Sequence, residues 1–66
     1  MSLATDRAFQ ESAAKFFEHH GFRVIYALHE ELWMLHPNDK AEAAKYGTAV
    51  LSPRAMRSIG EMLSKF

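Results

Sequence analysis

The stretch FRVIYALHEELWMLH, from Phe22 to His36, decides the fold of this chain. Ten of its fifteen residues are apolar or aromatic, and it holds the only tryptophan, Trp33. Its first half alternates apolar side chains and is rich in β-branched and aromatic residues, a pattern typical of a strand. A His-Glu-Glu connection at positions 29–31 leads into a second apolar run, LWMLH. We therefore expect two antiparallel strands joined by a hairpin.

The same stretch also fits a helix. Ile25, Leu28, Leu32 and Leu35 fall at helical spacing, and LHEELWML consists of good helix formers. The proposed hairpin connection also lacks the Asn-Gly or Asp-Gly pair that marks a tight turn. A helix here would make the chain an all-α bundle, which stays open as the alternative. Pro37 ends the stretch in either case.

The segment from Ala4 to His20 predicts an amphipathic helix before this centre. Its apolar residues at positions 9, 13, 16 and 17 form one stripe at helical spacing. Thr5 or Asp6 can cap its first turn, because a side-chain oxygen accepts from the free N–H groups there. Gly21 can end it, since glycine adopts positive φ easily.

A short alanine-rich helix, DKAEAAKY, is predicted after Pro37. Asn38 or Asp39 can cap it, and Gly47 can close it. Because its only large apolar residue is Tyr46, we expect this helix to cover the edge of the core.

The run TAVL at positions 48–51 predicts a brief strand, and a last helix follows it. Ser52 before Pro53 is a typical helix start, with a hydroxyl cap and then proline at the first helical position. The helix is expected to continue to about Lys65. Its apolar residues keep the spacing of a coiled-coil seam, and Arg54, Arg57, Glu61 and Lys65 are expected to face away from that seam.

These elements predict an α+β fold in a single domain over residues 1–66. A small antiparallel sheet of about three short strands would pack against two main helices, in the order helix, strand, strand, helix, strand, helix. This order resembles the α-β-β-β-α layout of double-stranded-RNA-binding domains. Those domains carry a lysine-rich KKxAK motif at the start of the last helix, where this chain has SPRAMRS. TAVLSPRAM is also similar to the strand-then-helix opening of ribbon-helix-helix repressors, whose second helix has no counterpart in this sequence. Neither similarity identifies the family.

The chain is short and rich in large apolar residues. It has 66 residues, of which twenty from Phe9 onward are large and apolar or aromatic. A chain of this length buries only about 60% of its unfolded surface, so one core cannot hide them all. A contiguous apolar surface usually marks an interface. We therefore expect a small accessory module that acts through protein–protein contact, most simply as a homodimer.

The predicted interface lies mainly on the last helix. Its seam is either core against the sheet or a pairing surface, and methionine suits both roles. Phe66 follows the expected end of the helix, where burial within one chain is difficult. The predicted interface residues are Met56, Ile59, Met62, Leu63, Phe66 and Trp33.

Nucleic-acid binding is the first alternative function. Arg54 and Arg57 would stand at the start of the last helix, where arginines can engage phosphate, with Arg23 as a further contact. The net charge is zero, with eight basic and eight acidic residues, so a strong general attraction to nucleic acid is not expected.

Metal binding is the second and less favoured alternative function. His19, His20, His29 and His36 are many histidines for this length, but they lack the short paired spacing of zinc sites. We therefore assign no metal and no cofactor.

No serine, histidine and acidic residue form a recognisable catalytic set, so no enzyme is predicted and no catalytic residue is assigned. The chain has no cysteine, which excludes disulfides and thiolate ligands and fits a reducing compartment. No segment has eighteen consecutive apolar residues. We expect a cytoplasmic protein without membrane contact.

Overall fold

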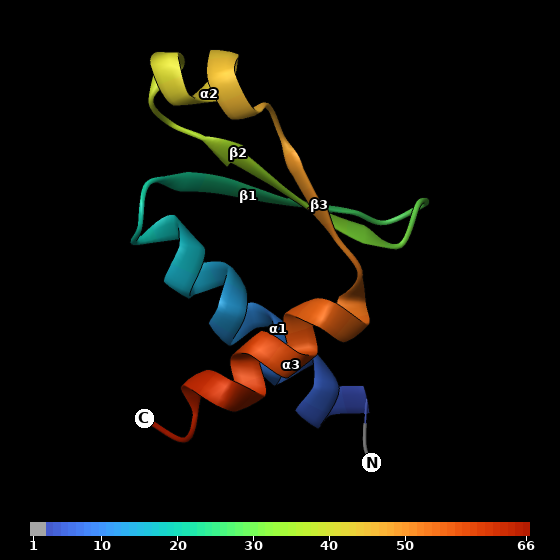
Figure 1. Ribbon diagram of the computed structural model, residues 1–66. Helices are drawn as coiled ribbons and strands as arrows, with labels where there is room; N and C mark the ends of the chain where they lie inside the picture. Colours follow the sequence, from blue (N-terminus) through green and yellow to red (C-terminus); the bar gives the residue numbers. More distant parts are fainter. Residues whose placement is uncertain (1–2) are drawn as a thin grey trace.

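The computed structural model describes the backbone of residues 3–66 and the side chains of residues 6–66. Its elements follow in the order α1 (Leu3–Glu18), β1 (Phe22–Ala27), β2 (Leu32–Pro37), α2 (Lys40–Tyr46), β3 (Ala49–Leu51) and α3 (Pro53–Leu63), as Figure 1 shows. The predicted α+β fold and element order are confirmed. The all-α alternative is wrong, because the central stretch forms two strands.

The sheet has the strand order β1-β2-β3, and both neighbouring pairs are antiparallel. In the first pair, Phe22 lies opposite Pro37 and Ala27 opposite Leu32. The hairpin turns at residues 28–31, where Glu31 has a φ of 54°. This left-handed region is sterically unfavourable for a residue with a Cβ, and glycine is usually found there. In this turn Glu31 takes that conformation instead of a glycine.

The pleat gives the sheet two different faces, because successive side chains point to opposite sides. The inner face packs on the helices and includes the buried Leu35, which contacts the buried Ala13, Ala14 and Met56 of α1 and α3. Around them pack the partly buried Phe17, Phe22, Val24, Trp33, Leu51 and Ile59.

Two helices, α1 and α3, cross each other against this inner face (Figure 1). Gly60 of α3 is buried at the crossing, and a Cβ there would overlap the backbone carbonyl of Phe9. The absence of a side chain at position 60 therefore allows the two backbones to touch. On α1 the small Ala13 is also fully buried and belongs to the core cluster.

The first helix starts earlier than predicted. It begins at Leu3, so Thr5 and Asp6 lie inside it and the prediction that one of them caps it is wrong. Nothing in LATDRAFQ breaks a helix, which explains the earlier start. It ends at Glu18 rather than His20, and Gly21 follows with the expected positive φ of 89°.

The later helices start as predicted. The Asp39 carboxylate accepts from the N–H groups of Ala41 and Glu42 at 2.7 and 3.1 Å, and the Ser52 hydroxyl accepts from the Ala55 N–H at 3.1 Å. The last helix is slightly shorter than predicted, because α3 ends at Leu63 and not at about Lys65.

The prediction that the short helix covers the edge of the core is wrong. None of the residues of α2 is buried, and it lies at the end of the sheet away from the α1–α3 crossing (Figure 1). Its alanines are too short to reach the core from there, and the ring of Tyr46 is exposed.

Candidate interaction surface

The outer face of the sheet carries a row of apolar side chains. Ile25 pairs with Met34 in β2, and Met34 pairs in turn with Val50 in β3, so the three residues form one line across all three strands. Ile25 is 41% exposed and Val50 is 58% exposed, while Met34 between them is partly buried. We call this line the outer row. It offers a flat apolar strip on the side of the sheet opposite the α1–α3 pair.

The chain is less compact than a typical domain of its length. Its radius of gyration is 12.2 Å, against about 11 Å for a compact chain of this length. The Cα atoms extend over 39 × 31 × 12 Å, which is a flat shape. A flat molecule has two broad faces and little interior, which explains why few large side chains are buried.

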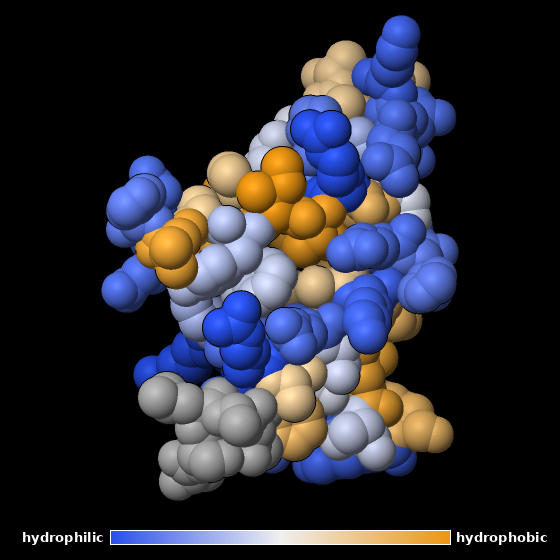
Figure 2. Space-filling model, turned by 180° about the vertical axis from the view of Figure 1, so that it is seen from behind, coloured by the Kyte–Doolittle hydropathy of each residue, from blue (hydrophilic) through white to orange (hydrophobic). Residues whose placement is uncertain are grey.

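Hydrophobic side chains accordingly reach the surface in several places. Figure 2 shows them in the middle of the molecule as seen from behind, with hydrophilic side chains around them. The large apolar residues that are most exposed include Leu28 in the hairpin turn and Met62 near the end of α3.

The predicted seam on the last helix divides into an inner and an outer part. Met56 is fully buried and Ile59 packs against the core, so these two residues hold α3 in place. Met62 is 59% exposed and Phe66 is 97% exposed, and Leu63 between them is partly buried. Only the C-terminal part of the seam is therefore available to a partner.

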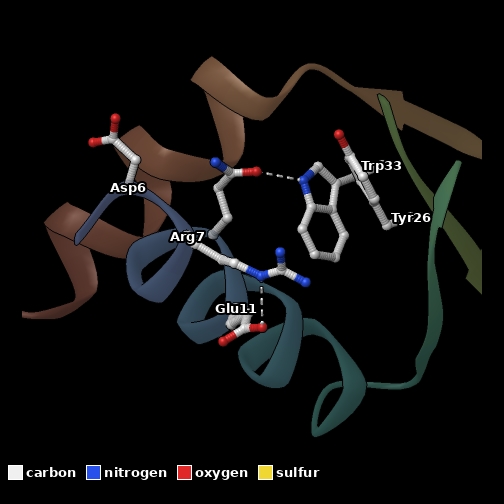
Figure 3. Close-up of a pocket in the computed structure, with 6 residues that line it drawn as sticks. Asp6, Arg7, Glu11, Tyr26 and Trp33 are labelled. Carbon is white, nitrogen blue, oxygen red and sulfur yellow. Dashed lines mark hydrogen bonds and ion pairs between the residues drawn. The ribbon is translucent and has the colours of Figure 1, made fainter. Parts of the chain in front are cut away.

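Trp33 lies on the inner face of the sheet. Its indole N–H donates to the Gln10 side-chain oxygen at 2.9 Å, which links β2 to α1. Its ring lies 4.9 Å from that of Tyr26, centroid to centroid. Together these residues line a cleft of about 370 Å³ between α1 and the hairpin, drawn in Figure 3 with Asp6, Arg7 and Glu11. The cleft has an aromatic wall and a charged rim in which Arg7 lies 3.5 Å from Glu11.

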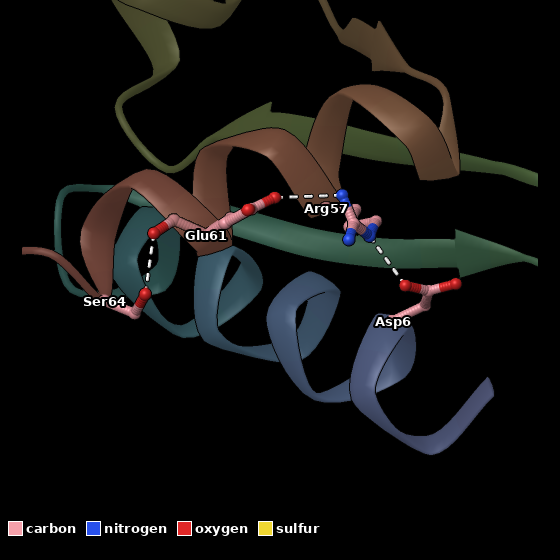
Figure 4. Close-up of polar contacts among 4 residues, drawn as sticks. All are labelled: Asp6, Arg57, Glu61 and Ser64. Atoms are coloured by element: carbon pink, nitrogen blue, oxygen red, sulfur yellow. Dashed lines mark hydrogen bonds and ion pairs between the residues drawn. The ribbon is translucent and has the colours of Figure 1, made fainter. Parts of the chain in front are cut away.

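The three arginines of the nucleic-acid hypothesis lie on different elements and in different surroundings. Arg57 donates to the Asp6 carboxylate at 2.6 Å and to Glu61 at 2.9 Å, as Figure 4 shows. The hydrogen bond that Arg57 donates to Asp6, together with the negative charges of Asp6 and Glu61, raises the pKa of Arg57 against the effect of burial. Arg57 thus ties α3 to α1, whereas Arg54 is exposed on α3 and Arg23 is exposed on β1.

The four histidines are spread along the chain, and all of them are exposed. His19 and His20 follow α1, where the ring of His20 lies over that of Phe16, with 4.2 Å between centroids. His29 stands in the hairpin turn, and His36 in β2. Within residues 6–66, no three His, Cys, Asp or Glu side chains lie together in a geometry that could hold a metal ion.

The outer row was not among the predicted site residues, although part of the signal was present. The alternation in FRVIYAL that predicts Phe22, Val24 and Tyr26 on one face also puts Ile25 on the other. The missing information was the register, which aligns Met34 and Val50 with it.

Comparison of the chain with models of protein families, with curated proteins and with solved structures gave no significant match. Among the described residues, no helix is both long enough and apolar enough to cross a bilayer.

Proposed function

We propose that this chain is a protein–protein interaction module without catalytic activity, and that it pairs with a second copy of itself through the outer face of its sheet. The observation that carries the proposal is the outer row of Ile25, Met34 and Val50, in register across all three strands. The free energy falls when a second apolar surface removes a row of exposed apolar side chains from water.

The apolar character of the outer row and the neutral net charge support a second copy as the partner. An apolar strip is complementary to itself, as the two-fold symmetry of a homodimer requires. The net charge of zero means that two copies do not repel each other at long range. The proposal includes a cytoplasmic location, with which the absence of cysteine agrees.

The test is the solution mass by light scattering over a hundredfold range of protein concentration. We expect the natural chain to form dimers and the double variant Ile25→Lys with Val50→Lys to be monomeric. Both positions are exposed on strands, so lysine is tolerated there in the folded monomer. A monomeric mass for the natural chain at every concentration would contradict self-association.

A matched control uses the other exposed apolar pair. Met62→Lys with Phe66→Lys adds the same charge and removes the same number of apolar side chains near the end of α3. We expect this variant to remain dimeric. If it dissociates while the sheet variant stays dimeric, the interface lies on α3 and the assignment to the outer face is wrong.

A further inference from the structure

A second hollow lies at the end of the sheet next to α2. It has a volume of about 290 Å³, and its lining includes Arg23, His36, Asn38 and Lys40. Every ionisable side chain in this lining is basic, whereas the cleft beside Trp33 has both acidic and basic side chains. A chain with equal numbers of acidic and basic residues has thus gathered positive charge in one concave place.

The sheet and the loop after it bring these groups together. Arg23 and His36 are directly opposite each other across β1 and β2. Basic side chains at facing positions repel each other when both are charged, so this pairing does not stabilise the sheet. The Asn38 N–H donates to the Gly21 carbonyl oxygen at 3.0 Å, which fixes the loop between β2 and α2, and with it Lys40 at the start of α2, beside the start of β1.

The cationic groups of the hollow are not neutralised by the protein. In the part of the chain that the structure describes, neither Arg23 nor Lys40 has a carboxylate within 4.0 Å. Asp39 and Glu42 are near Lys40 in sequence, but neither carboxylate lies within 4.0 Å of its ammonium group, and that of Asp39 accepts from the N–H groups of Ala41 and Glu42. The potential in the hollow therefore favours an anion.

The imidazole ring of His36 is held in one orientation by a hydrogen bond. The Nδ1 atom of His36 lies 2.9 Å from the hydroxyl of Thr48, the residue before β3. This hydrogen bond restrains the imidazole ring and leaves its Nε2 atom for a ligand. Pro37 is buried beside it and gives the hollow a rigid wall.

We propose that this hollow binds a phosphate group, either free or as a monoester on a small molecule. The Arg23 guanidinium can engage two phosphate oxygens at once, and the Lys40 ammonium adds a second charge. The Asn38 amide supplies a further hydrogen-bond donor, and so does the His36 Nε2 atom when it carries the ring proton. A dianion suits two permanent positive charges, and the small volume suits a compact ligand.

The experiment is an amide chemical-shift titration by NMR with inorganic phosphate, compared with sodium chloride at matched ionic strength. We expect saturable shifts at Arg23, His36 and Asn38 with phosphate alone. Arg23→Gln should weaken binding about tenfold to a hundredfold, the value of one charge-assisted hydrogen bond. Arg54→Gln removes the same charge from an exposed site on α3 and should leave binding unchanged. Equal weakening by both variants, or equal shifts with chloride, would overturn the proposal.

Two further arms complete the test. Lys40→Gln changes an exposed residue at the start of α2 and keeps the test valid if Arg23→Gln fails to fold. A nucleoside 5′-monophosphate distinguishes the source of the ligand, because tighter binding than inorganic phosphate indicates an ester and equal binding indicates free phosphate. A DNA oligomer without terminal phosphates should bind more weakly than either. If it binds more tightly through the same residues, the ligand is a phosphodiester chain and the monoester proposal is wrong.

Discussion

At the crossing of α1 and α3 backbone touches backbone, whereas at the other end of the molecule α2 buries no residue (Figure 1). The crossing contains Gly60 and the fully buried Met56, and Arg57 binds carboxylates on both helices there. The α2 end contains exposed alanines and the basic hollow instead. Packing density and binding features are therefore separated in this chain.

This separation indicates how a chain of 66 residues can both fold and present candidate binding surfaces. Free energy of folding comes mainly from buried apolar area and close packing, and both are concentrated where α1 and α3 meet the inner face. The outer row and the hollow contribute little to that core, so their side chains can be chosen for a ligand or a partner. Changes at the two ends should accordingly have very different consequences.

The largest effect is expected from Gly60→Ala. The added methyl group would overlap the Phe9 carbonyl, so α1 and α3 must move apart and the core opens. We expect a loss of about 3 kcal/mol or more in the free energy of unfolding, measured by urea denaturation at fixed protein concentration. Ser58→Ala, at an exposed position of the same helix, should change it by less than about 0.5 kcal/mol. A gain of about 1 kcal/mol from Gly60→Ala, as helix propensity alone predicts, would contradict the close crossing.

The next largest effect is expected when the same substitution is made at one of two methionines on α3. Met56 is fully buried and Met62 is 59% exposed, so the same substitution removes core contacts in one case and surface contacts in the other. Met56→Ala should cost at least about 2 kcal/mol, because it leaves a cavity. Met62→Ala should cost less than about 0.5 kcal/mol. Similar losses from both, measured by thermal unfolding followed by circular dichroism, would mean that the end of α3 is also part of the core.

Much of the fold could be predicted from local patterns in the sequence. Alternation in FRVIYAL and the pair Ser52-Pro53 each report on neighbouring residues, and both predictions are confirmed. The predicted start of α1 was wrong because Asp6, a possible cap residue, is equally favourable inside the first turn of a helix. The predicted role of α2 was wrong because its composition carries no information about where along the sheet it lies.

The candidate surfaces depend on contacts between distant residues, and single-sequence patterns do not contain them. The outer row needs the register of β1, β2 and β3, and the basic hollow needs Arg23 to meet Lys40 across two elements. The seam on α3 shows the same limit. Its spacing identifies one apolar stripe, but the crossing with α1 decides that Met56 is core and Phe66 is not.

The smallest effects are expected from removing the caps of α2 and α3. Comparing the two variants tests whether the α2 end of the molecule unfolds together with the α1–α3 crossing. Ser52→Ala removes the hydroxyl that accepts from the Ala55 N–H, and Asp39→Ala removes the carboxylate that accepts from Ala41 and Glu42. Each loses about 1 kcal/mol of helix capping. Because α3 is packed in the core, Ser52→Ala should lower the global free energy of unfolding by that amount.

Asp39→Ala should instead act locally. Since α2 buries no residue, its amides should exchange with solvent about fivefold faster in native-state hydrogen exchange, the ratio that corresponds to about 1 kcal/mol, while the global value stays unchanged. An equal fall in global stability for both variants would show that α2 belongs to the same cooperative unit as the α1–α3 crossing. The packing boundary drawn between the two ends would then not be a boundary of stability, and the hollow beside α2 would be held by the whole fold.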